Sequence, residues 1–168
     1  SYHEAGHAFV SKYLLPENKI IRVSVIPTSK GAGGYTLSSP CREEVTSKKK
    51  IINHLSVLMA GRASEEVFFG NENITAGAQN DIEKATSLAL DYVTRYGMND
   101  SVFINYQLLS DKLRIPLTTV EESVKKLTSE IYGQVIKIIE DNKEKVGKIA
   151  RLLIEKEVIC QDELDNLL

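Results

Sequence analysis

The 168-residue chain lacks three features that would each indicate a different class of protein. Its 21 lysines and arginines stand against 23 aspartates and glutamates, so no basic excess indicates a nucleic-acid-binding protein. No apolar run approaches the roughly 18 residues that a membrane-spanning helix needs. Cysteine occurs only at Cys41 and Cys160, without a CxxC pair, which favours free thiols over a disulfide framework. With 42% hydrophobic and 26% charged residues, the chain is expected to be a soluble globular domain.

The spacing of apolar residues along most of the chain is helical. It predicts helices over 2–15, 46–69, 78–96, about 118–142 and 143–157, and a short helix in the last nine residues. The segments IIRVSVIP and YTLSS are typical of strands, so a hairpin is predicted over 20–39 around the glycine-rich TSKGAGG. The segment 98–116 is predicted to be irregular and partly extended.

These predictions together describe one domain over 1–168, mainly α, with a small β-hairpin or sheet beside the first helix. No internal repeat and no low-complexity linker divides it. Because the chain begins inside a motif, we expect it to be a fragment of a longer protein.

The opening segment, SYHEAGHAFV, places His3 and His7 four residues apart, with Glu4 directly after the first. On a helix the two histidines are separated by about 40°, so both imidazoles can reach one metal ion. Glu4 lies about 100° from His3, where it can take a proton from a water activated by the metal. This is the H-E-x-x-H pattern of zinc metalloproteases, and a polar helix surface is the alternative interpretation. Ala5 and Gly6 are small enough to let a substrate or a second helix approach closely.

The third metal ligand does not come from this helix. Val10 and Tyr13 stand where the metzincin extension requires glycine and histidine, which excludes that class. His54 is a lone helical histidine, more typical of a surface residue than of a ligand. A carboxylate is therefore expected, either from the Glu65–Glu66 pair or from Asp81, and the residue pattern does not choose between them.

Five segments occur in order along the chain: YHEAGHAFV, GGYTLSSP, AGRASEEVFFG, TAGAQNDIEKAT and YVTRYGMND. Together they resemble the peptidase domain of the membrane-anchored, ATP-dependent zinc metalloproteases of the FtsH type, and the C-terminal segment resembles the closing helices of that domain. The resemblance implies that His3, His7 and Asp81 bind Zn²⁺ and that Glu4 is the general base of a zinc-dependent endopeptidase.

The same resemblance assigns roles to residues outside the opening helix. It places Glu65 near the metal, where it would orient a zinc-bound histidine. A solvated helix glutamate is the alternative. The strand with Gly33, Gly34, Tyr35 and Thr36 would offer its edge to an extended substrate. The alternative is that the glycines only form the hairpin turn.

Members of the FtsH type are homo-hexamers that degrade unfolded or membrane proteins. Their transmembrane helices and AAA+ module, which uses ATP and Mg²⁺, precede the peptidase domain, and neither is found in this sequence. The resemblance therefore implies attachment to a bacterial inner membrane facing the cytoplasm, or to an organelle inner membrane, through segments outside this chain. Local departures, such as MAGR in place of GGR, do not touch the four catalytic and metal-binding positions. A hexamerising platform for an ATPase, with proteolysis dispensable, is the alternative function, and a metal-bound regulatory domain is a third.

Overall fold

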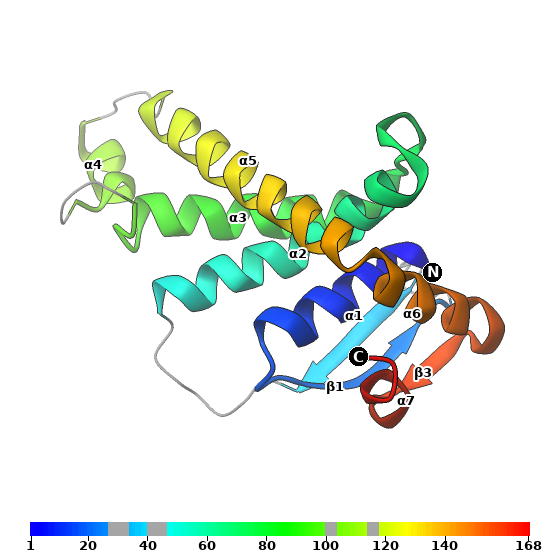
Figure 1. Ribbon diagram of the computed structural model, residues 1–168. Helices are drawn as coiled ribbons and strands as arrows, with labels where there is room; N and C mark the ends of the chain where they lie inside the picture. The colour runs from blue at the N-terminus through cyan, green and yellow to red at the C-terminus, as the bar shows by residue number, and fades with distance from the viewer. Residues whose placement is uncertain (27–33, 40–46, 100–103, 114–117) are drawn as a thin grey trace.

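A computed structural model describes residues 1–26, 34–39, 47–99, 104–113 and 118–168. In chain order its elements are α1 (Tyr2–Leu14), β1 (Lys19–Ser24), β2 (Tyr35–Ser39), α2 (Lys48–Phe69), α3 (Gln79–Thr94), α4 (Tyr106–Leu113), α5 (Thr118–Asp141), α6 (Lys143–Lys156), β3 (Val158–Cys160) and α7 (Gln161–Asp165). Two short 3₁₀ turns, η1 (Asn71–Asn73) and η2 (Ala76–Ala78), join α2 to α3. The predicted fold class, mainly α with a small sheet, is confirmed (Figure 1).

The first helix lies between the sheet and α2 (Figure 1). Ala5, Ala8 and Val10 are fully buried in this layer. A side chain on Gly6 would run into the carbonyl oxygen of Ala60, so the glycine is what lets the two helix backbones approach so closely. The sequence predicted that the small residues of α1 would let either a substrate or a second helix approach closely. At Gly6 the neighbour is a second helix, α2.

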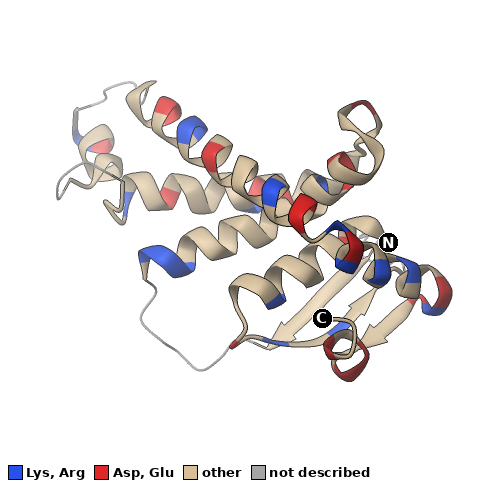
Figure 2. Ribbon diagram, in the orientation of Figure 1, with Lys and Arg blue, Asp and Glu red and all other residues tan. Residues whose placement is uncertain are grey.

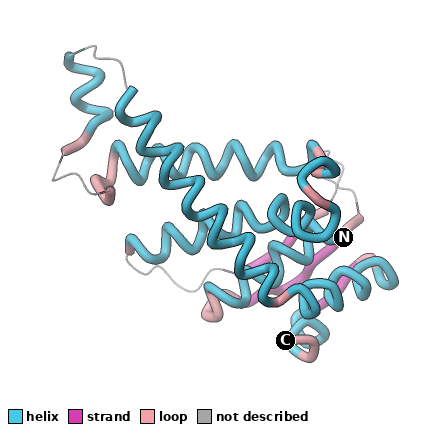
Figure 3. Tube along the Cα trace, turned by 45° about the horizontal axis from the view of Figure 1, so that its top comes forward, coloured by secondary structure: helices cyan, strands magenta, loops and turns pink. Residues whose placement is uncertain are grey.

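The sheet has three antiparallel strands in the order β2-β1-β3. Ser24 at the end of β1 stands opposite Tyr35 on one side and Val158 on the other, so β1 is the central strand. The predicted antiparallel pairing of β1 and β2 is confirmed, whereas the glycine-rich turn lies outside the described residues. The third strand comes from near the C-terminus and was not predicted, because three residues give no alternation to read. Figure 3 shows the sheet beneath the helices.

The two long helices α3 and α5 pack against α2 and cross each other (Figure 1). The Ser47 hydroxyl caps the start of α2 by accepting a hydrogen bond from the Lys50 backbone N–H at 3.2 Å. The helix ends at Gly70, whose φ of 85° favours glycine. The Tyr132 hydroxyl donates to the Glu66 carboxylate at 2.6 Å and so ties α5 to α2. Figure 2 shows acidic and basic residues spread over the same helices.

The sequence prediction was wrong for part of the segment 98–116. This segment contains helix α4, which begins where the Asn105 side chain accepts a hydrogen bond from the Leu108 N–H at 2.9 Å. Gln107 and Asp111, one turn apart on α4, are also hydrogen-bonded. The cap signal and the helical spacing of Tyr106, Leu109 and Leu113 were both present in the sequence, but eight residues give only about two turns from which to read a period.

Two other sequence predictions concern cysteine and the membrane. Cys160 is an exposed free thiol, as predicted, whereas Cys41 lies outside the described residues. Among the helices that the structure describes, none is long and apolar enough to cross a bilayer.

Candidate metal centre

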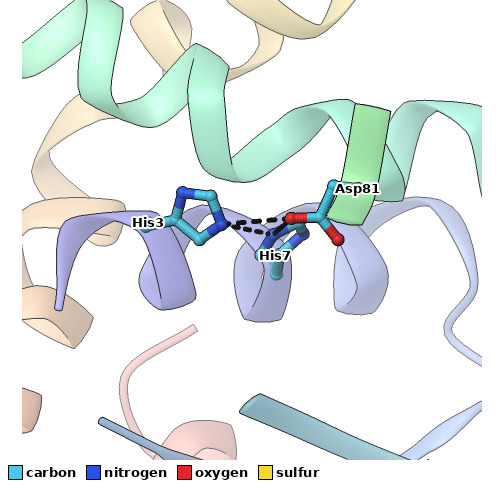
Figure 4. Close-up of side chains that lie close together, drawn as sticks. All are labelled: His3, His7 and Asp81. Carbon is cyan, nitrogen blue, oxygen red and sulfur yellow. Dashed lines mark hydrogen bonds and ion pairs between the residues drawn. The ribbon is translucent and has the colours of Figure 1, made fainter. Parts of the chain in front are cut away.

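Three side chains from two helices meet at one point beside α2. The Nε2 atoms of His3 and His7, both on α1, lie 3.0 Å apart. Each of them lies 3.2 Å from Oδ2 of Asp81, which is in the first turn of α3. Figure 4 shows both imidazoles pointing toward the Asp81 carboxylate. Among the residues that the structure describes, His3, His7 and Asp81 form the one group of at least three histidine, cysteine or carboxylate side chains close enough to share a metal ion.

The other nitrogen of each imidazole is held by α2. Nδ1 of His3 donates to Oε1 of Glu65 at 2.9 Å, and Nδ1 of His7 donates to the carbonyl oxygen of Val57 at 2.7 Å. A carboxylate and a carbonyl oxygen only accept hydrogen bonds, so each neutral ring carries its proton on Nδ1. Both Nε2 atoms therefore direct lone pairs toward the shared point, the orientation that metal-binding histidines adopt.

This donor set fits a metal ion. Two imidazole lone pairs and a carboxylate oxygen repel one another at 3.0–3.2 Å unless a positive charge lies between them. The three separations approach the roughly 3.3 Å edge of a tetrahedron with zinc bonds of about 2.0–2.1 Å. Two histidines and one carboxylate, with a fourth position free, form a donor set typical of catalytic zinc.

The pKa values of the site reflect the same close contacts. Burial lowers the pKa of His3, but the protonated ring can also donate from Nε2 to Asp81. That hydrogen bond and the charges of Glu4 and Glu65 outweigh burial, so the pKa lies above its usual 6.5. Burial raises the pKa of Asp81, but hydrogen bonds to His3 and His7 outweigh it and hold that pKa well below its usual range. Asp81 is therefore ionised at neutral pH, as a metal ligand must be.

The structure brings together most of the residues that the sequence singled out. Glu65 contacts the far side of His3 instead of the shared point, so Asp81 is the carboxylate that faces both Nε2 atoms. The Glu66 carboxylate accepts a hydrogen bond from the Tyr132 hydroxyl and is not in the three-residue group. His54 lies half-buried on α2 and is not in the three-residue group.

The half-buried Glu4 lies in the same cleft as the histidines, facing strand β2. The Thr36 hydroxyl donates to Oε2 of Glu4 at 3.4 Å, and a side chain on Gly34 would come within 2.8 Å of Oε1. A residue with a side chain at position 34 would therefore collide with the Glu4 carboxylate. The cleft has a volume of about 980 Å³ and includes Tyr35 in its wall, while Gly33 lies outside the described residues. Within the described residues, β2 pairs only with β1 and is an edge strand.

Sequence reasoning missed three residues of this centre. A side chain on Gly61 of α2 would run into Nε2 of His3 and come within 2.5 Å of Nε2 of His7. Val57 contributes through its backbone carbonyl, which no residue type could have signalled. Thr75, in the loop after α2, donates to Glu65 through its backbone N–H and its hydroxyl.

A helix bearing H-E-x-x-H, with an acidic residue facing both histidines, places the chain in the broad class of proteins built on that motif. The chain belongs to peptidase family M41, whose sequence profile matches residues 1–167.

Curated relatives cover nearly the whole chain. The chain is 38% identical over 168 residues to the ATP-dependent zinc metalloprotease FtsH of Lachnoclostridium phytofermentans, a match that covers 99% of this chain and 29% of that protein. It is 36% identical to FtsH 1 of Alkaliphilus metalliredigens, with 99% and 28% covered. It is 34% identical to the mitochondrial inner membrane m-AAA protease component yta12 of Schizosaccharomyces pombe, with 100% and 22% covered. The chain thus spans less than a third of these relatives.

Proposed function

We propose that the chain, over 1–168, is a single zinc-dependent endopeptidase domain. The observation that carries this proposal is the convergence of His3, His7 and Asp81 on one point, in a cleft that also contains Glu4. Membership of family M41 and the names of the relatives support it.

In this proposal His3, His7 and Asp81 hold Zn²⁺. When bound, zinc lowers the pKa of a water molecule and polarises the carbonyl of the scissile peptide. Glu4 accepts the proton of the attacking water and delivers it to the departing nitrogen. Glu65, through His3 Nδ1, and the Val57 carbonyl, through His7 Nδ1, keep both rings in the required tautomer and orientation.

The substrate binds in this proposal along β2, as an additional strand at the edge of the sheet. Gly34 and Thr36 bring this strand into contact with Glu4, so a peptide beside it would run past the catalytic carboxylate. Backbone hydrogen bonds carry little sequence information, which suits broad specificity for unfolded polypeptides.

The complete protein, by analogy with its relatives, is an ATP-dependent membrane protease that acts on unfolded or membrane proteins. We propose that it assembles as a homo-hexamer and that an AAA+ module outside this chain uses ATP and Mg²⁺. We further propose that it is anchored in a bacterial inner membrane, facing the cytoplasm, or in an organelle inner membrane, and that nucleic acid is not a partner. The relatives named as a metalloprotease and as a mitochondrial inner membrane component support this proposal.

Zinc stoichiometry and cleavage of casein or a flexible peptide, measured on the same preparation, test the function. We expect one zinc per chain and cleavage that a chelator abolishes and zinc restores. Asp81→Ala should lose zinc affinity by at least about tenfold, because a charged ligand is removed. Asp111→Ala, on exposed α4, is the matched control and should keep zinc and activity. A wild-type chain that holds zinc without cleavage would favour the platform or the regulatory domain.

A further inference from the structure

Thr75, in the short loop between α2 and α3, makes hydrogen bonds to α2 with all three of its polar groups. Its backbone N–H donates to Oε2 of Glu65 at 2.7 Å, and its hydroxyl lies 3.1 Å from Oε1 of the same carboxylate. Its carbonyl oxygen accepts from Nη2 of Arg62 at 3.3 Å. The three polar groups of Thr75 thus contact two residues that are one turn apart on α2.

The direction of the Thr75 hydroxyl bond follows from its neighbours. The hydroxyl oxygen accepts a hydrogen bond from the Gly77 N–H at 3.2 Å, at the start of η2. An ionised Glu65 only accepts, so the hydroxyl proton is directed toward Glu65. Serine could repeat both bonds, whereas valine, of nearly the same shape, could make neither.

These contacts connect the ligands of the proposed metal centre. On one side, Oε1 of Glu65 receives both the Thr75 hydroxyl and Nδ1 of His3. On the other side, the chain runs from Thr75 through η2 into α3, where Asp81 lies six residues later (81 − 75). Thr75 is therefore the residue through which the position of Asp81 and the orientation of His3 are linked.

We propose that Thr75 is a positioning residue that sets the geometry of the metal centre through Glu65 and the start of α3. The inference rests on the proposed function, because it assumes that His3, His7 and Asp81 hold zinc. Thr75 makes no hydrogen bond to the metal-binding side chains or to Glu4. It therefore acts on the centre only through Glu65 and the start of α3.

The alternative for Thr75 is a purely local role, as the cap of η2. A cap contributes to stability but does not set zinc affinity at a fixed degree of folding. The two roles are separated by measuring zinc affinity on folded protein, beside the unfolding temperature of the metal-free chain.

The experiment compares the wild-type chain with Thr75→Val, Thr75→Ser and the control Thr94→Val. Thr94 is a buried threonine at the end of α3 whose hydroxyl donates to the Leu90 carbonyl, far along the helix from Asp81. Zinc dissociation constants come from competition with a chelator. We expect Thr75→Val to bind zinc about tenfold more weakly, as when other supporting partners of metal ligands are removed. Thr75→Ser should stay within about twofold of wild type, and Thr94→Val should be unchanged.

Peptide cleavage supplies a second readout. At saturating zinc, Thr75→Val should recover activity to within about threefold of wild type, because Glu4 and β2 are untouched. Should Thr75→Val fail to fold, Thr75→Ala replaces it, since alanine also removes the hydroxyl and keeps the N–H.

Wild-type zinc affinity in Thr75→Val, or in Thr75→Ala where it is used, would overturn the inference, as would equal weakening in Thr75→Ser. A wild-type chain that binds zinc but cleaves nothing would contradict the proposed function alone. A wild-type chain that binds no zinc would contradict both.

Discussion

At the scale of single residues, Glu4 offers the sharpest separation of metal binding from catalysis. It stands one residue after His3, outside the three-residue group that would hold the metal, and its carboxylate contacts Thr36 of β2. Glu4→Gln is nearly isosteric and removes the negative charge together with the ability to accept a proton. We expect it to retain one zinc per chain and to lose about 10²–10⁴-fold in kcat, the usual contribution of a general base. Metal analysis and peptide cleavage on the same preparation measure both effects.

Glu83→Gln is a matched control for this change. Glu83 is an exposed residue near the start of α3, also in the cleft wall, and its carboxylate accepts from the side chain of Gln79. Its substitution should leave kcat within about twofold of wild type, since exposed pairs contribute little. Unchanged hydrolysis in purified Glu4→Gln protein would remove Glu4 from the mechanism.

The pKa of His3 predicts how zinc binding depends on pH. Burial lowers this pKa, but hydrogen bonding to Asp81 and nearby negative charge raise it above 6.5. Zinc needs the neutral imidazole, so zinc affinity should fall as the pH is lowered, and the fall should begin while the pH is still above 6.5. The expected slope is about tenfold in affinity per pH unit for each proton displaced. Chelator competition between about pH 5 and 8 measures this. A pH-independent affinity across that range would contradict the ligand role of His3.

In the metal-free protein the sign is opposite. A folded-state pKa above the unfolded value means that protonated His3 stabilises the fold. This contribution is fully present below pH 6.5 and is lost as the pH rises through the raised pKa. Zinc removal should therefore destabilise the chain more at neutral than at acid pH, as measured by thermal unfolding.

At the scale of elements, α2 leaves room for the proposed metal centre at Gly61. A side chain on Gly61 would enter the space beside Nε2 of His3 and His7. Gly61→Ala should therefore weaken zinc binding by at least about tenfold, because the rings must move, and overpacking should destabilise the fold by about 1–3 kcal/mol.

Gly133→Ala tests whether this effect belongs to the site. Gly133 is an exposed glycine within α5, and a side chain there meets nothing within 4 Å. Alanine at that position should keep zinc affinity and stabilise the chain by up to about 1 kcal/mol, from helix propensity alone. Equal zinc affinity in Gly61→Ala and wild type would show that the site tolerates a side chain at Gly61.

At the scale of the whole molecule, nothing in the described residues is an unfolding motor. A peptide must reach β2 and Glu4 in an extended form, and a stably folded protein does not present its backbone in that way. We therefore expect the chain alone to cleave flexible peptides and casein but to leave a stable folded protein intact. Gel analysis over a long incubation checks this. Degradation of a tightly folded substrate without ATP would contradict the proposal.

The sequence by itself determined the helical parts of the fold and half of the site. Apolar spacing predicted five helices, and both ends of each agree with the structure to within two residues: α1, α2, α3, α5 and α6. The agreement is this close because helical periodicity is local information. The same local geometry brought His3, Glu4 and His7 onto one helix. Strand β3 and helix α4 were missed because they are short, and short elements carry little periodic signal.

The residue pattern did not choose between Glu65 and Asp81, and the family resemblance implied Asp81. Only the tertiary structure shows which of the two carboxylates faces the histidines, and why. Glu65 and Asp81 are equally plausible along the chain, and the packing of α2 and α3 against α1 places Asp81 at Nε2 and Glu65 at Nδ1. The contacts of Gly61 and of the Val57 carbonyl with the two histidines could not be predicted from the sequence either. Their roles depend on contacts between segments some 50 residues apart, and such contacts are fixed by packing of side chains over the whole core instead of by any local pattern.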